Sequence, residues 1–423
     1  MAPAAITPER TPSPETASDL IKDGMKSNIL KTAPAVSNGN IQDGLLEDLN
    51  ASLLQTTLTT QPCSVPLPDS AESVATKTCT DHMVTCSWHS THGWSAPQLV
   101  PYGPLSIMPS ASVLHYATEC FEGMKLYRGY DGKLRLFRPL LNCRRMLKST
   151  ARIALPGFNP EELLKLIIRL CAVDGPKWLP KDRPGHFLYI RPTMIANDPA
   201  LGVQAPKEAL LFILLSCFPD MSKSATTGKP GLKLLASKED TCRAWPGGFG
   251  HAKVGANYGP TLVAQGEARR RGYDQILWLF GDRCRITEAG ASNFFVVWKT
   301  REGRTELVTA PIEDKIILDG ITRRSVLELV GERLIGVIDV VERHFEMGEI
   351  VEAIEEGRLL EAFAAGTAFF VAPVAEIHFR GMDLRIPMSE GDSGPYAGMI
   401  RRWLEHVMFG MTEHRDWAVL VDE

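Results

Sequence analysis

The 423-residue chain has no long apolar run, no paired cysteine motif and no excess of charge of either sign. No stretch of eighteen consecutive apolar residues occurs, so we expect no membrane-spanning helix. The 46 basic and 50 acidic residues nearly balance, which gives no reason to expect nucleic acid or an anionic membrane as a partner. A hydrophobic content of 44% is ordinary for a globular protein, and the length suggests two domains or more.

The nine cysteines give no sign of a disulfide framework. Their number is odd, their spacing is wide, and the absence of Cys-x-x-Cys argues against a structural zinc site or a redox pair. We therefore expect no metal, and we interpret the cysteines as reduced thiols in a reducing compartment.

Residues 1–60 are rich in proline, serine, threonine and alanine, and we predict that they form a disordered tail. An organellar transit peptide should be rich in arginine and poor in acids. Here seven acidic residues outnumber four basic ones, so we predict a cytoplasmic protein. The acids are Glu9, Glu15, Asp19, Asp23, Asp43, Glu47 and Asp48.

The rest of the chain predicts an α/β protein with two domains. We assign residues 61–221 to a small domain, 222–240 to a polar linker and 241–423 to a larger domain. Two alternating runs meet at Asp131-Gly132, which is typical of a β-hairpin. Further predicted strands cover 187–191, 209–217, 275–280 and 294–298, and predicted helices begin at 139 and 160 and cover 257–271, 322–334 and 348–356.

A lysine within small residues is the most informative feature of the sequence. Lys253 lies in the segment 250–259, which is rich in glycine, and Tyr258 follows five positions later. A lysine in a confined, partly desolvated site loses its proton easily and can form a Schiff base. Glu288, in Ile-Thr-Glu-Ala-Gly-Ala-Ser-Asn, suits a protonated pyridine nitrogen, because a buried carboxylate needs a cation. Together they predict a pyridoxal phosphate enzyme.

The two motifs, Lys-Val-Gly-Ala-Asn-Tyr and Ile-Thr-Glu-Ala-Gly-Ala-Ser-Asn, resemble those of the branched-chain amino acid aminotransferases, of the fold-type IV pyridoxal phosphate class. The resemblance extends from about Thr80 to near Trp417. It implies a small N-terminal and a larger C-terminal α/β domain, with the cofactor between them and the site completed in a homodimer. It also implies amino transfer between a branched-chain or other hydrophobic L-amino acid and 2-oxoglutarate.

The resemblance also assigns the cofactor contacts. Lys253 would hold the cofactor and carry the proton from the substrate α-carbon, Glu288 would contact the pyridine nitrogen, and Tyr258 the phenolate oxygen. Arg145 would bind the phosphate. The phosphate would also meet Ile321 and Thr322, at the start of a helix where free N–H groups suit an anion, and the hydroxyl of Thr367.

For the substrate, the resemblance implies that the backbone amides of Ala368 and Phe369 hold the α-carboxylate. Arg191, in Tyr189-Ile190-Arg191-Pro192, would take the distal carboxylate of 2-oxoglutarate together with Tyr116, because a guanidinium recognises a carboxylate bidentately. The remaining expected contacts are Tyr189 and Phe121 in the pocket, and Leu201 and Val203 contributed by the partner subunit.

Three expected pocket positions depart from related enzymes. Ala75 stands in place of a phenylalanine, Met221 in place of a tyrosine, and Ala291 in place of a threonine. These changes predict a larger and softer pocket that accepts long hydrophobic side chains and treats valine as the poorest branched substrate. Two alternatives remain open: another fold-type IV activity, such as D-amino acid transamination or aminodeoxychorismate lysis, and a catalytically silent paralogue that binds the cofactor.

Overall fold

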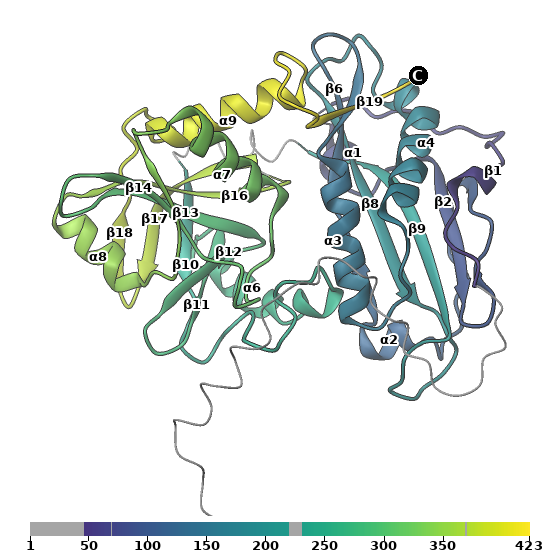
Figure 1. Ribbon diagram of the computed structural model, residues 1–423, viewed down its shortest axis with the longest axis horizontal. Coiled ribbons are helices and arrows are strands. Elements are labelled where there is room, and N and C mark those ends of the chain that lie inside the picture. The colour runs from purple at the N-terminus through teal and green to yellow at the C-terminus, as the bar shows by residue number, and fades with distance from the viewer. Residues whose placement is uncertain (1–45, 69, 220–230, 369) are drawn as a thin grey trace, which may run out of the picture. The chain divides into compact units, whose positions relative to one another are not determined.

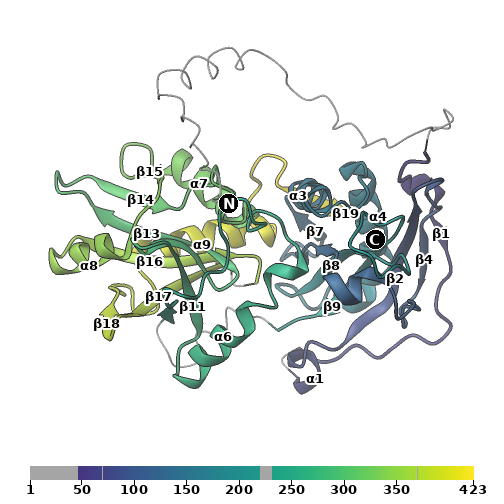
Figure 2. The same cartoon turned by 90° about the horizontal axis from the view of Figure 1, so that it is seen from below.

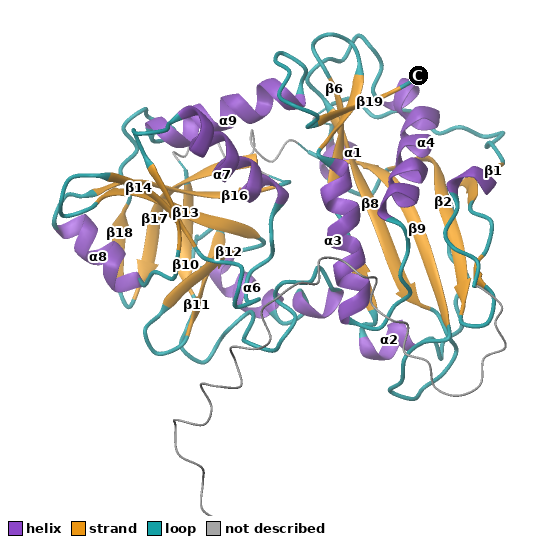
Figure 3. Cartoon of the chain, in the orientation of Figure 1, coloured by secondary structure: helices purple, strands orange, loops and turns teal. Residues whose placement is uncertain are grey.

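The computed structural model describes residues 46–68, 70–219, 231–368 and 370–423, and Leu46–Glu423 cluster as one unit of contacts. Helices and strands in this part of the chain build two large mixed sheets, with helices packed against both (Figures 1 and 3). The predicted α/β class is confirmed.

The first sheet contains ten strands in the order β1-β4-β2-β9-β8-β6-β7-β19, with β3 paired to β2 and β5 paired to β8. Its middle strands alternate buried and half-buried side chains, as one face packs on a core and the other meets further structure. The strands are β1 Gln55–Thr56, β2 Cys79–His89, β3 Gly93–Trp94, β4 Gln98–Pro101, β5 Glu119–Phe121, β6 Met124–Arg128, β7 Leu134–Phe137, β8 Phe187–Ala196, β9 Glu208–Cys217 and β19 Ala418–Val421.

Two helices beside the first sheet follow directly from sequence signals. The side chain of Asn159 accepts a hydrogen bond from the Glu161 amide, and Pro160 occupies the first turn, so α4 (Pro160–Trp178) starts where predicted. Its buried leucines recur at helical spacing and pack towards β2, while its other neighbour is α3 (Pro139–Arg152), which carries Arg145 (Figures 1 and 2). The short helices are α1 Ala71–Val74, α2 Ser112–Tyr116 and the 3-10 turn η1 Ala51–Leu53.

The second sheet contains nine strands in the order β12-β11-β10-β17-β16-β13-β14-β15, with β18 paired to β17. An additional pairing between β12 and β13 closes β12-β11-β10-β17-β16-β13 into a ring. The strands are β10 Leu232–Ala236, β11 Gln275–Phe280, β12 Arg285–Ala289, β13 Ser292–Lys299, β14 Thr305–Thr309, β15 Asp339–Glu342, β16 Leu359–Gly366, β17 Phe370–Phe379 and β18 Met382–Arg385.

Four helices pack on this second sheet. Helix α6 (Thr261–Arg270) contacts β11, α7 (Ile321–Arg333) and α8 (Met347–Glu355) contact β16, and α9 (Pro395–Met408) contacts β16 and β17. Helix α6 starts four residues later than predicted, because the chain first makes the 3-10 turn η2 (Gly255–Asn257) and then passes through Pro260. The described residues include no helix that is long and apolar enough to span a bilayer.

Three sequence-based boundaries are wrong. Leu232–Ala236, in the predicted linker, is strand β10, which pairs in parallel with both β11 and β17. Residues 418–421, assigned to the larger domain, form β19 and pair with β7 of the first sheet. Within the predicted disordered tail, residues 46–60 belong to the fold, because Leu49 is buried in the first core and β1 pairs with β4. The tail prediction for residues 1–45 and the linker prediction for 222–230 lie outside the described residues.

We expect Leu49→Ala to lower the free energy of unfolding by about 2–5 kcal/mol, because it removes a side chain that is 1% exposed and leaves a cavity. Leu53→Ala, in the same segment but 52% exposed, is the matched control and should change it by no more than about 0.5 kcal/mol. Urea unfolding of both variants measures the difference. Equal, small effects would mean that residues 46–60 add nothing to the core.

A buried carboxyl group lies where α9 begins. Glu361 of β16 is 1% exposed, and its Oε1 accepts a hydrogen bond of 3.0 Å from the Ala397 amide. Burial raises the pKa of Glu361 to about 7, against the opposing effect of the helix amides. A Cβ on Gly394 would lie 1.7 Å from Glu361 Oε2, so only glycine fits beside this carboxyl.

This raised pKa predicts a pH dependence of stability. The folded state keeps the Glu361 proton up to about pH 7, whereas the unfolded chain releases it near 4.5, so stability present below pH 4.5 is lost as the pH rises to about 7. Glu361→Gln keeps an acceptor for the Ala397 amide but does not ionise, and its melting temperature should therefore gain on that of the parent protein across this range. Parallel melting curves from pH 5 to pH 8 would contradict this assignment.

Candidate functional site

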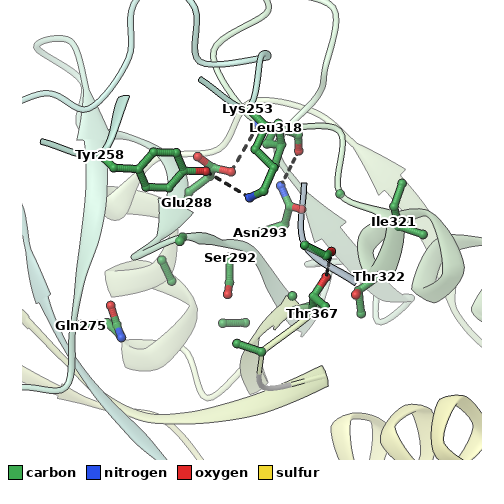
Figure 4. A pocket seen from close by; sticks show the side chains of 18 of the residues that line it. Lys253, Tyr258, Gln275, Glu288, Ser292, Asn293, Leu318, Ile321, Thr322 and Thr367 are labelled. Atoms are coloured by element: carbon green, nitrogen blue, oxygen red, sulfur yellow. Dashed lines mark hydrogen bonds between the residues drawn. The ribbon is translucent and has the colours of Figure 1, made fainter. Parts of the chain in front are cut away.

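A cavity of about 410 Å³ collects most of the predicted site residues. Its walls come from the β12–β13 turn, the start of α7, the turn after β16 and the loop that carries Lys253, with residues of β5 and β8 completing the lining. Figure 4 shows the side chains of Lys253, Tyr258 and Glu288 together in this cavity, and those of Thr322 and Thr367 as a second group. Segments far apart in the sequence therefore meet at one site.

The main chain of Lys253 is held from two sides. Its amide donates to Ser149 Oγ of α3 at 2.8 Å, and its carbonyl accepts from the Phe121 amide of β5 at 3.0 Å. Asn257 fixes the loop further by donating to two of its carbonyls. The side chain then points into the cavity, where Nζ donates to Tyr258 Oη at 3.1 Å (Figure 4).

Aromatic rings surround the amine of Lys253. Nζ lies 4.8 Å from the centre of the Phe121 ring, which is itself tilted against the Tyr258 ring at 5.1 Å. Gly255, two residues after the lysine, must be glycine, because a Cβ there would lie 1.9 Å from Glu119 Oε1. These contacts leave the amine one fixed position beside an aromatic hydroxyl.

Glu288 lies on β12 and is 2% exposed. Its Oε1 accepts from the Leu318 amide at 3.3 Å, and its Oε2 forms an ion pair with the guanidinium of Arg243. Burial raises the pKa of Glu288, and the charge of Arg243 acts in the opposite direction. Arg243 is a site residue that sequence reasoning missed.

Arg145 of α3 is also held by an acid that sequence reasoning missed. Its Nε and one terminal nitrogen donate to the two carboxylate oxygens of Glu122 at 2.7 and 2.9 Å, and the other terminal nitrogen donates to the Asp319 carbonyl at 3.0 Å. Glu122 is fully buried, and the positive charge of Arg145 overcomes that burial and lowers the pKa of Glu122. A guanidinium has five N–H groups, so this arrangement leaves donors for a ligand.

The start of α7 faces the same end of the cavity. Gly320, at the N-cap, has no side chain with which to cap the helix, so the first amides are available to an anion. A Cβ on Gly320 would lie 2.1 Å from Asn293 Oδ1, which explains the glycine. Thr322 and Thr367 add hydroxyl groups to the lining, and Thr367 Oγ1 donates to the Gly123 carbonyl at 3.5 Å.

These features fit the expected cofactor. A buried carboxylate, an amine beside a phenol, and a cradle made of an arginine, hydroxyl groups and an uncapped helix start are what a phosphorylated pyridine aldehyde needs from a protein. The described residues contain no group of three or more His, Cys, Asp or Glu side chains suited to a metal ion.

Arg191 and Tyr189 of β8 line another wall of the cavity. The guanidinium of Arg191 donates to Tyr189 Oη at 3.1 Å and lies over the Phe121 ring at 4.5 Å. Its Nε is buried without a hydrogen-bond partner among the described residues. Ala291 and Ala368 line the cavity as well, so this wall combines apolar surface with one cation.

Four predicted substrate residues are not brought into this lining. Ala75 ends α1 and does not line the cavity, and Tyr116 donates its hydroxyl to the Leu201 carbonyl instead. Met221 and Phe369 lie outside the described residues. The roles of all four stay predictions.

We expect Glu122→Ala to destabilise the protein by about 3–5 kcal/mol, because it leaves the guanidinium of Arg145 buried without its counter-ion. Glu161→Ala is the matched control, since Glu161 pairs with the neighbouring Arg144 at 3.6 Å where both side chains are more than half exposed. That variant should lose at most about 1 kcal/mol. Denaturant unfolding measures both, and a Glu122 variant as stable as the Glu161 variant would contradict the assigned pairing.

Comparison with known proteins points to one family. The profile of the family described as Amino-transferase class IV matches residues 119–377. The cytosolic branched-chain-amino-acid aminotransferase of Saccharomyces cerevisiae is 46% identical over 381 residues, which cover 89% of this chain and 99% of that protein. The mitochondrial enzyme of Schizosaccharomyces pombe is 44% identical, over 84% of this chain and 82% of that protein.

A solved structure with the same fold contains a derivative of the expected cofactor. It is a branched-chain amino acid aminotransferase, from the source abbreviated T.th., complexed with N-(5'-phosphopyridoxyl)-L-glutamate. The two structures superpose with a TM-score of 0.60 at 25% sequence identity, over 80% of this chain and 98% of the other.

Proposed function

The chain belongs to the class IV aminotransferases, and we propose that it transfers an amino group between a branched-chain or other hydrophobic L-amino acid and 2-oxoglutarate. The observation that carries this proposal is the meeting of Lys253, Glu288 and Arg145 on one cavity that also has an apolar wall with Arg191. The names of the similar yeast enzymes support the substrate class.

Pyridoxal 5'-phosphate is the cofactor, and when bound it supplies an electron sink for the charge that develops at the substrate α-carbon. The amine of Lys253 holds the cofactor and, once released by the substrate amine, acts as the base that removes the α-proton and returns it. The hydrogen bond from Nζ to Tyr258 Oη keeps this amine in place between transfers.

Glu288 and the anion cradle orient the cofactor from opposite ends. The carboxylate of Glu288 favours a proton on the pyridine nitrogen, which strengthens the pull on electrons from the reacting carbon. Arg145, the first amides of α7 and the hydroxyls of Thr322 and Thr367 would hold the phosphate. Tyr258 would donate to the phenolate oxygen of the ring.

One pocket must accept both an apolar side chain and a carboxylate. Phe121 and Ala291 provide apolar surface, and Arg191 provides the cation for the distal carboxylate of 2-oxoglutarate or glutamate. The Ala368 amide, with that of Phe369, would hold the α-carboxylate that all the substrates share. Ala291 adds volume and removes a hydroxyl, which favours longer hydrophobic side chains.

We also propose that the enzyme is a cytoplasmic homodimer. Leu201 and Val203 are 61% and 88% exposed, which suits side chains that reach the site of a partner subunit. The acidic composition of the first sixty residues supports the cytoplasm, and the similar enzymes of yeasts include both cytosolic and mitochondrial ones.

The test of function is an amino-transfer assay with 2-oxoglutarate as acceptor. L-leucine should give glutamate and the matching oxo acid at equal rates, while D-leucine should give none. The values of kcat/KM should be comparable for leucine and phenylalanine and lowest for valine. A preference for valine with rejection of phenylalanine would contradict the enlarged pocket, and turnover of D-leucine alone would favour the D-amino acid alternative. Absence of turnover with every substrate would favour the silent paralogue.

Borohydride reduction of the cofactor-loaded protein should attach the cofactor to Lys253, because its amine is the one placed between Tyr258 and Phe121 in the cavity. Lys125 is the matched control, since it is also buried but lies over the rings of Phe187 and Phe370. Peptide mass spectrometry locates the adduct. An adduct on Lys125, or one that persists in Lys253→Ala, would contradict the assignment.

A further inference from the structure

Arg243 is buried at the edge of the site without a part in the chemistry described above. It lies in the loop between β10 and Lys253, and its side chain is 4% exposed. Its guanidinium pairs with Oε2 of Glu288 and lies 6.0 Å from the centre of the Tyr258 ring. Arg243 is therefore the cation that neighbours both of the groups that would hold the cofactor ring.

Glu288 needs such a cation. Its side chain is 3% exposed, and a carboxyl group in such surroundings tends to keep its proton. A neutral carboxyl would be a hydrogen-bond donor towards the pyridine nitrogen, which would then lack a proton and attract electrons weakly. Burial alone therefore works against the role assigned to Glu288.

We propose that Arg243 is a positioning residue that keeps Glu288 ionised, so that the proton shared with the cofactor stays on the pyridine nitrogen. The proposal rests on the proposed function only in its use of the bound cofactor. One proton is at issue: it lies either on Glu288 Oε or on the ring nitrogen. Arginine does not release its own proton in proteins, so Arg243 acts through its charge alone.

The geometry leaves room for this arrangement. Glu288 Oε1 accepts one hydrogen bond from the Leu318 amide, and Oε2 faces Arg243. A carboxylate has about four lone-pair sites, so acceptor capacity remains for the N–H of the ring. A fixed positive charge beside the carboxylate stabilises the state with a negative oxygen and a protonated ring over the neutral pair.

The experiment compares Arg243→Met, which keeps bulk without charge, with Arg243→Lys, which keeps charge. Arg152→Met is the matched control, because Arg152 donates to the Gly247 and Gly248 carbonyls of the same loop but is exposed and does not touch Glu288. Each protein is loaded with cofactor labelled with ¹⁵N in the ring, and the ¹⁵N chemical shift reports whether the nitrogen carries the proton.

We expect the shift of a protonated nitrogen in the parent protein, in Arg243→Lys and in Arg152→Met, and a move towards the unprotonated shift in Arg243→Met. Turnover of Arg243→Met should fall by roughly 10–100-fold with leucine and glutamate alike, as for a residue that orients a contacting group. An unchanged ¹⁵N shift in Arg243→Met would overturn the proposal. The shift does not depend on which substrate is used, so it separates this result from a failure of the proposed function.

A second measurement covers a variant that does not take up cofactor. The infrared band of a protonated carboxyl group is recorded in the cofactor-free proteins at pH 7. Arg243→Met should show a band that is weaker in the parent protein and disappears in the double variant Arg243→Met/Glu288→Gln. Equal bands in the parent protein and Arg243→Met would overturn the proposal without any activity measurement.

Discussion

The site depends on how the backbone of Lys253 is fixed. The residue is held by a hydroxyl of α3 on one side and by the main chain of β5 on the other, and both elements belong with the first sheet. Glu288 and the start of α7 come instead from elements of the second sheet. The loop that carries the lysine therefore sets the distance between an amine fixed to one sheet and the ring and phosphate contacts fixed to the other.

The same cavity shows how charge is kept in a poorly hydrated place. Arg145 pairs with Glu122, and Glu288 pairs with Arg243, so a positive and a negative group each have a counter-ion at a different end. Such pairs cost desolvation and add little net stability, but they fix geometry before a ligand arrives. An electrostatic environment that is already oriented needs no rearrangement during the reaction.

Local signals predicted the parts that depend on local chemistry. The Asp131-Gly132 turn, the Asn159-Pro160 helix start and the motifs around Lys253 and Glu288 all lie within a few residues of the structure they determine. Glu122 and Arg243 were missed because their partners are distant in sequence, and no periodicity marks an ion pair. Strand β10 was missed because a short strand within a polar, glycine-containing stretch is stabilised by its neighbours β11 and β17.

The place of the C-terminal strand affects how the protein is made. Strand β7 pairs with β6 on one side, but on the other it pairs with β19, which is among the last residues to leave the ribosome. Until then β7 is an open sheet edge in the nascent chain, with backbone groups that can pair with other chains. Closing that edge joins residues far apart in the described chain, a non-local contact of the kind that slows folding. The last strand thus both completes the first sheet and ends the period during which the newborn chain is most prone to aggregate.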